Sequence, residues 1–190
     1  MRYTIPTRVL AALCLTLVVA CDPGSAPTES ARTNFNLVGR SGFGFNGTVS
    51  GFPHGVVRLT GGGSFNPSTA SNTVGAKTSV HSGGGFDCVE TVAQGPIAGC
   101  ATGQGVRWDT AQLLESTSFK CTGSDALKPI TTDAHTAVLL ADFYRAGDGN
   151  DESFTAQMIV SDHDIAPNIP GIQNLWVQGV GCGTANVNFN

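Results

Sequence analysis

Residues 137–161 read AVLLADFYRAGDGNDESFTAQMIVS, two apolar runs separated by an acidic turn. Side chains of the second run alternate with the period of two that strands show, and one face comprises Phe154, Ala156, Met158 and Val160. The turn, residues 147–151, holds Gly, Asp and Asn, which tolerate positive φ. The first run, residues 137–144, is apolar on both faces apart from Asp142, as in a strand covered on both sides. The stretch therefore predicts a long antiparallel hairpin.

Further short strands are predicted on either side of this hairpin. They cover residues 43–49, 56–60, 73–80, 86–92, 118–122, 174–180 and 185–189, with residues 103–109 as strand or loop. Residues 110–116, TAQLLES, give the best helical segment, of one or two turns. Pro167 and Pro170 predict a loop over residues 162–171. About ten short antiparallel strands and at most one short helix predict an all-β fold, a β-sandwich or barrel-like domain over residues 42–190.

Two glycine runs, Gly61–Gly63 and Gly83–Gly85, recur 22 residues apart, and each leads to a phenylalanine. We expect them to bulge a strand or turn a sheet corner before the aromatic side chain enters the core. A phosphate-binding loop is disfavoured, because neither a lysine nor a helix follows either run.

The first twenty residues have the pattern of an export signal. Arg2 and Arg8 precede an uncharged apolar segment, residues 9–20, which is too short to span a bilayer. The segment ends in Val18-Val19-Ala20-Cys21, which resembles the lipobox of bacterial lipoproteins. The resemblance implies lipidation of Cys21 and anchoring to the outer side of a bacterial membrane, in the cell envelope. The alternative is an ordinary secretory signal cleaved nearby. Residues 21–41 lack periodicity, which predicts a flexible lipidated tether.

Charge excludes one class of partner. Without Arg2 and Arg8 the chain has eight basic and fourteen acidic residues, a formal net charge of −6, so nucleic-acid binding is not expected. Charged residues make up 13% of the chain against a usual share of about 25%, which is typical of an exported all-β domain rather than a helical bundle.

Four cysteines remain for the exported domain. Cys88, Cys100, Cys121 and Cys182 would lie in an oxidising compartment, where an even number predicts two disulfides. We favour Cys88–Cys100 with Cys121–Cys182, because the first closes a short loop through a Gly-Pro turn. The competing pairing joins Cys88 to Cys121 and Cys100 to Cys182. A zinc site is disfavoured, since no Cys-x-x-Cys is present.

The hairpin turn contains the oxygen ligands that calcium prefers. Its candidates are Asp148, Asn150, Asp151 and Glu152. The spacing does not match an EF-hand, so a solvated turn is the favoured interpretation. No other cofactor is expected.

Residues 161–164, Ser-Asp-His-Asp, form the densest group of catalytic-type side chains. His163 could act as a base held by Asp162 or Asp164. No Gly-x-Ser-x-Gly elbow supplies an activated serine, and the other histidines are dispersed, so catalysis is disfavoured. A hydrolase or metal-dependent enzyme using these residues is therefore the alternative hypothesis.

Trp176 is the better of the two tryptophans for ligand binding. It alternates with Gln178, which predicts that its ring faces outward, where it could bind a carbohydrate or protein ligand. The alternative is packing in the core, which is the commoner role of an aromatic side chain. The favoured hypothesis is thus a lipid-anchored, non-catalytic binding or structural module outside the bacterial membrane.

Overall fold

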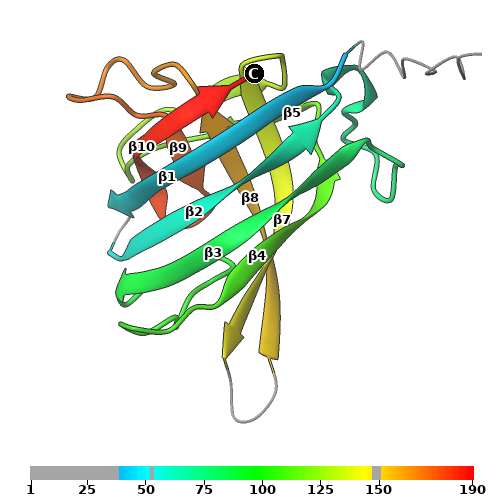
Figure 1. Ribbon diagram of the computed structural model, residues 1–190. Coiled ribbons are helices and arrows are strands. Elements are labelled where there is room, and N and C mark those ends of the chain that lie inside the picture. Colours follow the sequence, from blue (N-terminus) through cyan, green and yellow to red (C-terminus); the bar gives the residue numbers. More distant parts are fainter. Residues whose placement is uncertain (1–38, 52–53, 147–150) are drawn as a thin grey trace, which may run out of the picture. The chain divides into compact units, whose positions relative to one another are not determined.

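The computed structural model describes residues 39–51, 54–146 and 151–190, with residues 151 and 152 described in their backbone only (Figure 1). Within these ranges the chain forms ten strands and a single 3-10 turn, η1 (Pro67–Thr69). The strands are β1 (Ser41–Gly51), β2 (Val56–Phe65), β3 (Val80–Glu90), β4 (Arg107–Leu113), β5 (Ser116–Phe119), β6 (Lys128–Thr131), β7 (Thr136–Ala146), β8 (Asp151–Ser161), β9 (Leu175–Val177) and β10 (Gly181–Phe189). None of the described helical segments is long and apolar enough to cross a membrane.

Eight of the strands form a closed barrel in the order β1-β10-β9-β8-β7-β4-β3-β2, and every neighbouring pair is antiparallel. The barrel closes because β1 pairs with β2 on one side and with β10 on the other. The remaining two strands, β5 and β6, form a separate hairpin. The all-β prediction is confirmed, and of its two architectures the chain adopts the barrel.

The predicted central hairpin is confirmed. Strands β7 and β8 pair from Thr136 opposite Ser161 to Ala146 opposite Asp151. Leu139 opposite Met158 contributes to the barrel core, whereas Val138 and its partner Ile159 pack in a second core. This second core explains why β7 is apolar on both faces.

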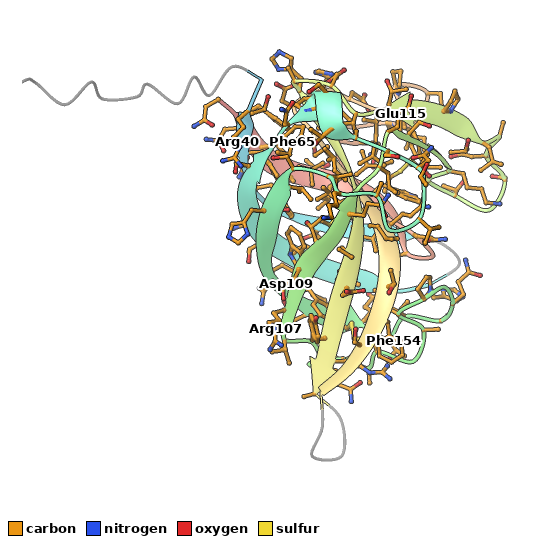
Figure 2. All side chains as sticks on the ribbon, turned by 90° about the vertical axis from the view of Figure 1, so that its right-hand side faces the viewer. Arg40, Phe65, Arg107, Asp109, Glu115 and Phe154 are labelled. Carbon is orange, nitrogen blue, oxygen red and sulfur yellow. A yellow bond between two sulfur atoms is a disulfide. The ribbon has the colours of Figure 1, made fainter. Side chains whose placement is uncertain are left out.

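Apolar side chains fill the barrel. Figure 2 draws these side chains and labels Phe65 next to η1 at one end of the barrel and Phe154 towards the opposite end. The largest completely buried side chain is Trp108 of β4, whose indole Nε1 donates to the carbonyl oxygen of Thr60 at 3.0 Å. The barrel thus has a packed interior, as is usual at eight strands.

The glycine runs do not bulge or turn the sheet, contrary to expectation. They lie in the middle of β2 and β3 and pair with each other, Gly61 opposite Gly84 and Gly62 opposite Gly83. A Cβ atom on Gly61 would lie 2.4 Å from Cζ2 of Trp108. The missing side chain therefore makes room for the indole ring inside the barrel.

The second core lies on the outer side of β7–β10, beneath the β5–β6 hairpin. Its buried members are Leu114, Phe119, Cys121, Val138, Ile159, Ala166, Trp176 and Cys182. The aromatic rings of Phe119 and Trp176 are 5.9 Å apart. This hairpin covers a face of the barrel that would otherwise be apolar and exposed.

The helix predicted over residues 110–116 is wrong. Residues up to Leu113 belong to β4, which pairs with β7 and is irregular between Thr110 and Gln112. Leu113 packs in the barrel and Leu114 in the second core, an arrangement that needs successive side chains on opposite faces. Two separate cores thus override a weak local helical preference.

Several strand boundaries also differ from prediction. Residues 73–79 form a loop, which Gln112 holds by donating from Nε2 to the carbonyl oxygens of Ser71 at 2.6 Å and Thr73 at 2.9 Å. Strand β9 is only three residues long, and the side-chain amide of Asn174 extends its pairing. That amide accepts from the Ala185 backbone N–H at 2.8 Å and donates to the Ala185 carbonyl at 3.0 Å.

Both predicted disulfides form, in the favoured pairing. Cys88 of β3 joins Cys100, with a Cα–Cα distance of 6.2 Å, and Cys121 joins Cys182 of β10 at 4.7 Å. Cys121 follows β5, so the second bridge ties the outer hairpin to the barrel wall.

Candidate functional site

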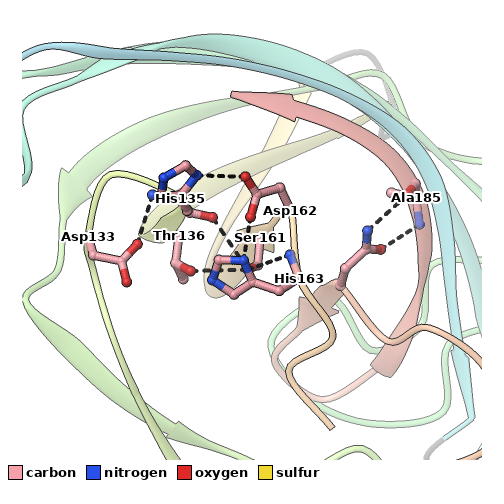
Figure 3. A network of polar contacts seen from close by, with 8 residues as sticks. Asp133, His135, Thr136, Ser161, Asp162, His163 and Ala185 are labelled. Carbon is pink, nitrogen blue, oxygen red and sulfur yellow. Dashed lines mark hydrogen bonds and ion pairs between the residues drawn. The ribbon is translucent and has the colours of Figure 1, made fainter. Parts of the chain in front are cut away.

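Two histidines meet at one aspartate where β7 begins and β8 ends (Figure 3). His135 precedes β7 and Asp162 follows β8, and the backbone N–H of Asp162 donates to the carbonyl of His135 at 3.2 Å. Asp133 fixes the turn before β7, because its Oδ1 accepts from the backbone N–H of His135 at 2.8 Å. The register of the hairpin therefore brings His135 next to residues 162 and 163.

The carboxylate of Asp162 contacts both imidazole rings. Its Oδ2 is 2.7 Å from Nδ1 of His135, and its Oδ1 contacts Nδ1 of His163. The ring centroids of the two histidines are 6.0 Å apart. Both rings are more than half exposed, at 61% and 57% of their side-chain surface. Each ring therefore contacts the carboxylate through Nδ1 and not through Nε2.

Of the predicted catalytic candidates, the structure brings His163 and Asp162 together but not Asp164. Oδ1 of Asp164 accepts from the backbone N–H groups of Ala166 at 2.9 Å and Gln173 at 3.1 Å, so this carboxylate closes its own loop. Ser161 is completely buried, and its Oγ lies 3.0 Å from Oγ1 of Thr136. A serine in this position is not accessible to a substrate.

His135 is the member of this group that sequence analysis missed. The signal was present in the hairpin register, because extending the pairing by one residue beyond Thr136 and Ser161 places 135 opposite 162.

Within the ranges that the structure describes, no three His, Cys, Asp or Glu side chains are arranged to hold a metal ion.

Some predicted positions cannot be compared with the structure. Asp148 and Asn150 lie outside the described residues, and Asp151 and Glu152 are described in their backbone only, at the start of β8. The calcium site therefore stays a prediction. Cys21 also lies outside the described residues.

Trp176 faces away from the barrel interior, but the expectation of an exposed ring is wrong. Its residue is only 5% exposed, because the β5–β6 hairpin covers it. Its indole Nε1 donates to the carbonyl of Lys120 at 3.0 Å. Sequence periodicity gave the direction of the side chain, whereas the covering hairpin decided its burial. Trp176 borders a surface hollow of about 190 Å³.

Exposed uncharged polar side chains gather on the outer side of β10, β1 and β2, which lie side by side in Figure 1. We call this surface the amide face, and its residues are Asn46, Thr48, Thr60, Thr184, Asn186 and Asn188. Asn46 lies directly opposite Asn186 on the neighbouring strand, and Thr48 lies opposite Thr184. Cβ atoms of such directly opposed residues are about 5 Å apart, so the two amides form one cluster.

Three hollows surround this cluster. One, of about 440 Å³, is bordered by Asn46 and Thr60. A second, of about 340 Å³, is bordered by Asn186 and Asn188. The third, of about 420 Å³, is bordered by Thr48 and Thr184 together with the Cys121–Cys182 disulfide. None of these three hollows includes His135, Asp162 or His163.

The charges bordering the amide face neutralise each other. The guanidinium of Arg58 donates through Nε to Oδ1 of Asp87 at 3.0 Å and through a second nitrogen to Oδ2 at 3.2 Å. This bidentate ion pair neutralises the charge beside Asn46. Arg58, Asp87 and Asn46 all border the 440 Å³ hollow. The amide face is consequently polar without a net charge.

Comparison of the chain with protein-family models, with curated proteins and with solved structures found no match.

Proposed function

We propose that this protein is an exported, lipid-anchored module that binds its ligand on the outside of its barrel and does not catalyse a reaction. The observation that carries the proposal is the packed interior. Eight-stranded barrels that hold a small ligand keep space for it inside, whereas here Trp108, Phe143 and Leu139 are completely buried in the barrel core. The outer surface is the part of this barrel that remains available to a ligand.

Export is supported by two features of the chain. The leader and Cys21 resemble a lipoprotein signal, and the two disulfides are consistent with a location outside the cytoplasm. A diacylglyceryl group with an additional acyl chain on Cys21 would supply the several hydrocarbon chains that stable anchoring needs.

Absence of catalysis is the second part of the proposal. Nucleophilic catalysis needs an accessible nucleophile beside its base, and the serine nearest to His163 in the sequence is buried. Asp164 is engaged by two backbone N–H groups. Of the two carboxylates considered as partners of His163, only Asp162 contacts its ring.

Intact mass of the membrane-extracted protein tests export and anchoring. We expect the mass of a chain that begins at Cys21 and carries the lipid. Reduction should then increase this mass by four hydrogens, because two disulfides are broken. The Cys21→Ser variant should move from the membrane to the soluble fraction. A mature protein that starts elsewhere, or wild-type protein that is soluble, would contradict the anchor.

A hydrolase remains a second hypothesis, because Asp162 orients the exposed imidazole of His163. It is tested with a panel of chromogenic carboxylate and phosphate esters, comparing the wild type with His163→Ala and His135→Ala. If the protein is not an enzyme, the wild type should hydrolyse these esters no faster than the two variants do. Loss of a measurable wild-type rate in His163→Ala would favour the enzyme.

A further inference from the structure

We propose that the amide face is a binding site for a neutral oligosaccharide. The inference deepens the proposed function and rests on it, since it assigns a ligand class to the outer surface of the barrel. The residues that would carry binding are Asn46 and Asn186, with Thr48, Thr60 and Asn188 around them.

The first argument is the hydrogen-bonding capacity of this cluster. Each asparagine amide offers two N–H donors and a carbonyl acceptor, and sugar hydroxyls both donate and accept. Asn46 and Asn186 are exposed and face each other across the β1–β10 ladder. The described part of the chain forms no hydrogen bond with either side-chain amide. Both amides are therefore free to pair with ligand groups.

The second argument is shape. The three hollows measure about 340, 420 and 440 Å³, and small-molecule sites commonly hold roughly 300–1,000 Å³. Gly44 and Gly62 lie opposite each other on β1 and β2, in the row next to Asn46 and Thr60, and neither adds a side chain to the outer surface there. The side chain of Asn188 lies over Gly44, where an added Cβ would be 3.0 Å from its Oδ1. A chain of several sugar units can contact neighbouring hollows at once.

The third argument is charge. Arg58 lies opposite Thr48 on the same side of the sheet, where Asp87 neutralises it, and the six residues that define the face carry no charge. An ionic ligand would lose hydration without gaining an opposite charge, which is costly. A neutral ligand with many hydroxyl groups pays a smaller desolvation cost, because the amides and hydroxyls of the protein replace its hydrogen bonds to water.

A polypeptide ligand is less well matched to this surface. Extended peptides commonly bind by adding a strand to a free sheet edge. β1 and β2, which carry Asn46, Thr48 and Thr60, are paired on both sides and offer no free edge. On the side away from β1, β10 pairs with β9 only at residues 181–183 and with the Asn174 amide at Ala185. Inward-facing residues such as Phe45 and Val49 are buried, which leaves polar side chains on the outer face.

Surface plasmon resonance on the full chain in nanodiscs tests the inference. The probes are hexasaccharides of glucose and of N-acetylglucosamine, with two charged oligomers of equal length, the cationic hexamer of glucosamine and the anionic hexamer of galacturonic acid. We expect a neutral hexamer to bind with a Kd on the order of 1 mM, because several net hydrogen bonds contribute modestly. The charged hexamers should bind more weakly.

The decisive variant is Asn46→Ala combined with Asn186→Ala, which should weaken binding about tenfold or more through loss of both amides. Thr131→Ala is the matched control, because Thr131 is also exposed on a strand but belongs to β6, outside the face. The control should bind like the wild type, and all three proteins should unfold at similar temperatures.

Three results would overturn the inference: no binding of either neutral hexamer, stronger binding of a charged one, or equal binding by the double variant and the wild type. These outcomes leave the intact-mass and ester assays unaffected. A failure of the oligosaccharide site is thus distinguishable from a failure of the lipid anchor or of the non-catalytic role.

Discussion

Substitution of Gly61 by alanine is expected to destabilise the barrel, whereas the same change at Gly85 is not. Both glycines belong to the paired runs in β2 and β3. A Cβ on Gly61 would lie 2.4 Å from Cζ2 of Trp108 and 2.7 Å from the carbonyl oxygen of Gly83. A Cβ on Gly85 would meet its nearest atom, Oγ1 of Thr60, at 3.5 Å, an ordinary contact.

The magnitude follows from these distances. The Trp108 ring is completely buried and its Nε1 is hydrogen-bonded, so it cannot move aside without losing that bond. Overpacking of this kind costs about 1–3 kcal/mol, which for a chain of this size lowers the midpoint of thermal unfolding by about 2–12 °C. Gly85→Ala should be neutral or stabilise the fold by up to about 1 kcal/mol, because alanine restricts the unfolded chain.

Urea unfolding followed by tryptophan fluorescence measures both variants under oxidising conditions, with the disulfides intact. A double variant that adds Trp108→Leu to Gly61→Ala removes the clashing ring. Its loss of stability should be smaller than the sum of the two single losses, by about 1 kcal/mol. Equal stabilities for Gly61→Ala and Gly85→Ala, or strict additivity with Trp108→Leu, would refute the close packing of glycine against indole.

Three further changes test the two disulfides and the side-chain amide of Asn174. Removing the Cys121–Cys182 bridge, which spans 61 residues, should cost about 4 kcal/mol of unfolding free energy, against about 3 kcal/mol for Cys88–Cys100, which spans 12. Urea unfolding of the two Ser/Ser variants gives the order, and a reversed order would contradict the loop-length argument. Asn174→Ala should cost about 1–3 kcal/mol, because it leaves a buried N–H and C=O without their partner. Calorimetry should show no comparable loss for the exposed Asn168→Ala, and equal stabilities would refute a bridging role for the amide.

The local sequence predicted the structure correctly where a contact depends on strand periodicity or on residues close together in the chain. Alternation over residues 154–160 predicted which side chains of β8 enter the core, and hairpin chemistry predicted its partner strand. The short Gly-Pro loop favoured the Cys88–Cys100 bridge, and the structure confirms it. In these cases the relevant contacts are set by period and by short separations along the chain.

Prediction failed where the structure depends on packing between segments that are far apart in the sequence. The glycine run at 61–63 looked like a turn signal, but its role depends on Trp108, nearly fifty residues later. Residues 110–116 looked helical, since no local pattern shows that β4 must serve two cores. Asp162 and His163 were predicted as candidates, but His135 was missed for the same reason, because its place beside them requires the exact pairing of β7 with β8.

The sequence by itself determined the all-β class, the central hairpin and the set of cysteines that pair, because alternation and composition act through neighbouring residues. The tertiary structure alone decided that the strands close into a barrel, that a hairpin covers Trp176, and that Asn46 meets Asn186. Each of these depends on which strands become neighbours, and strand order is fixed by burial over the whole chain rather than by any short segment.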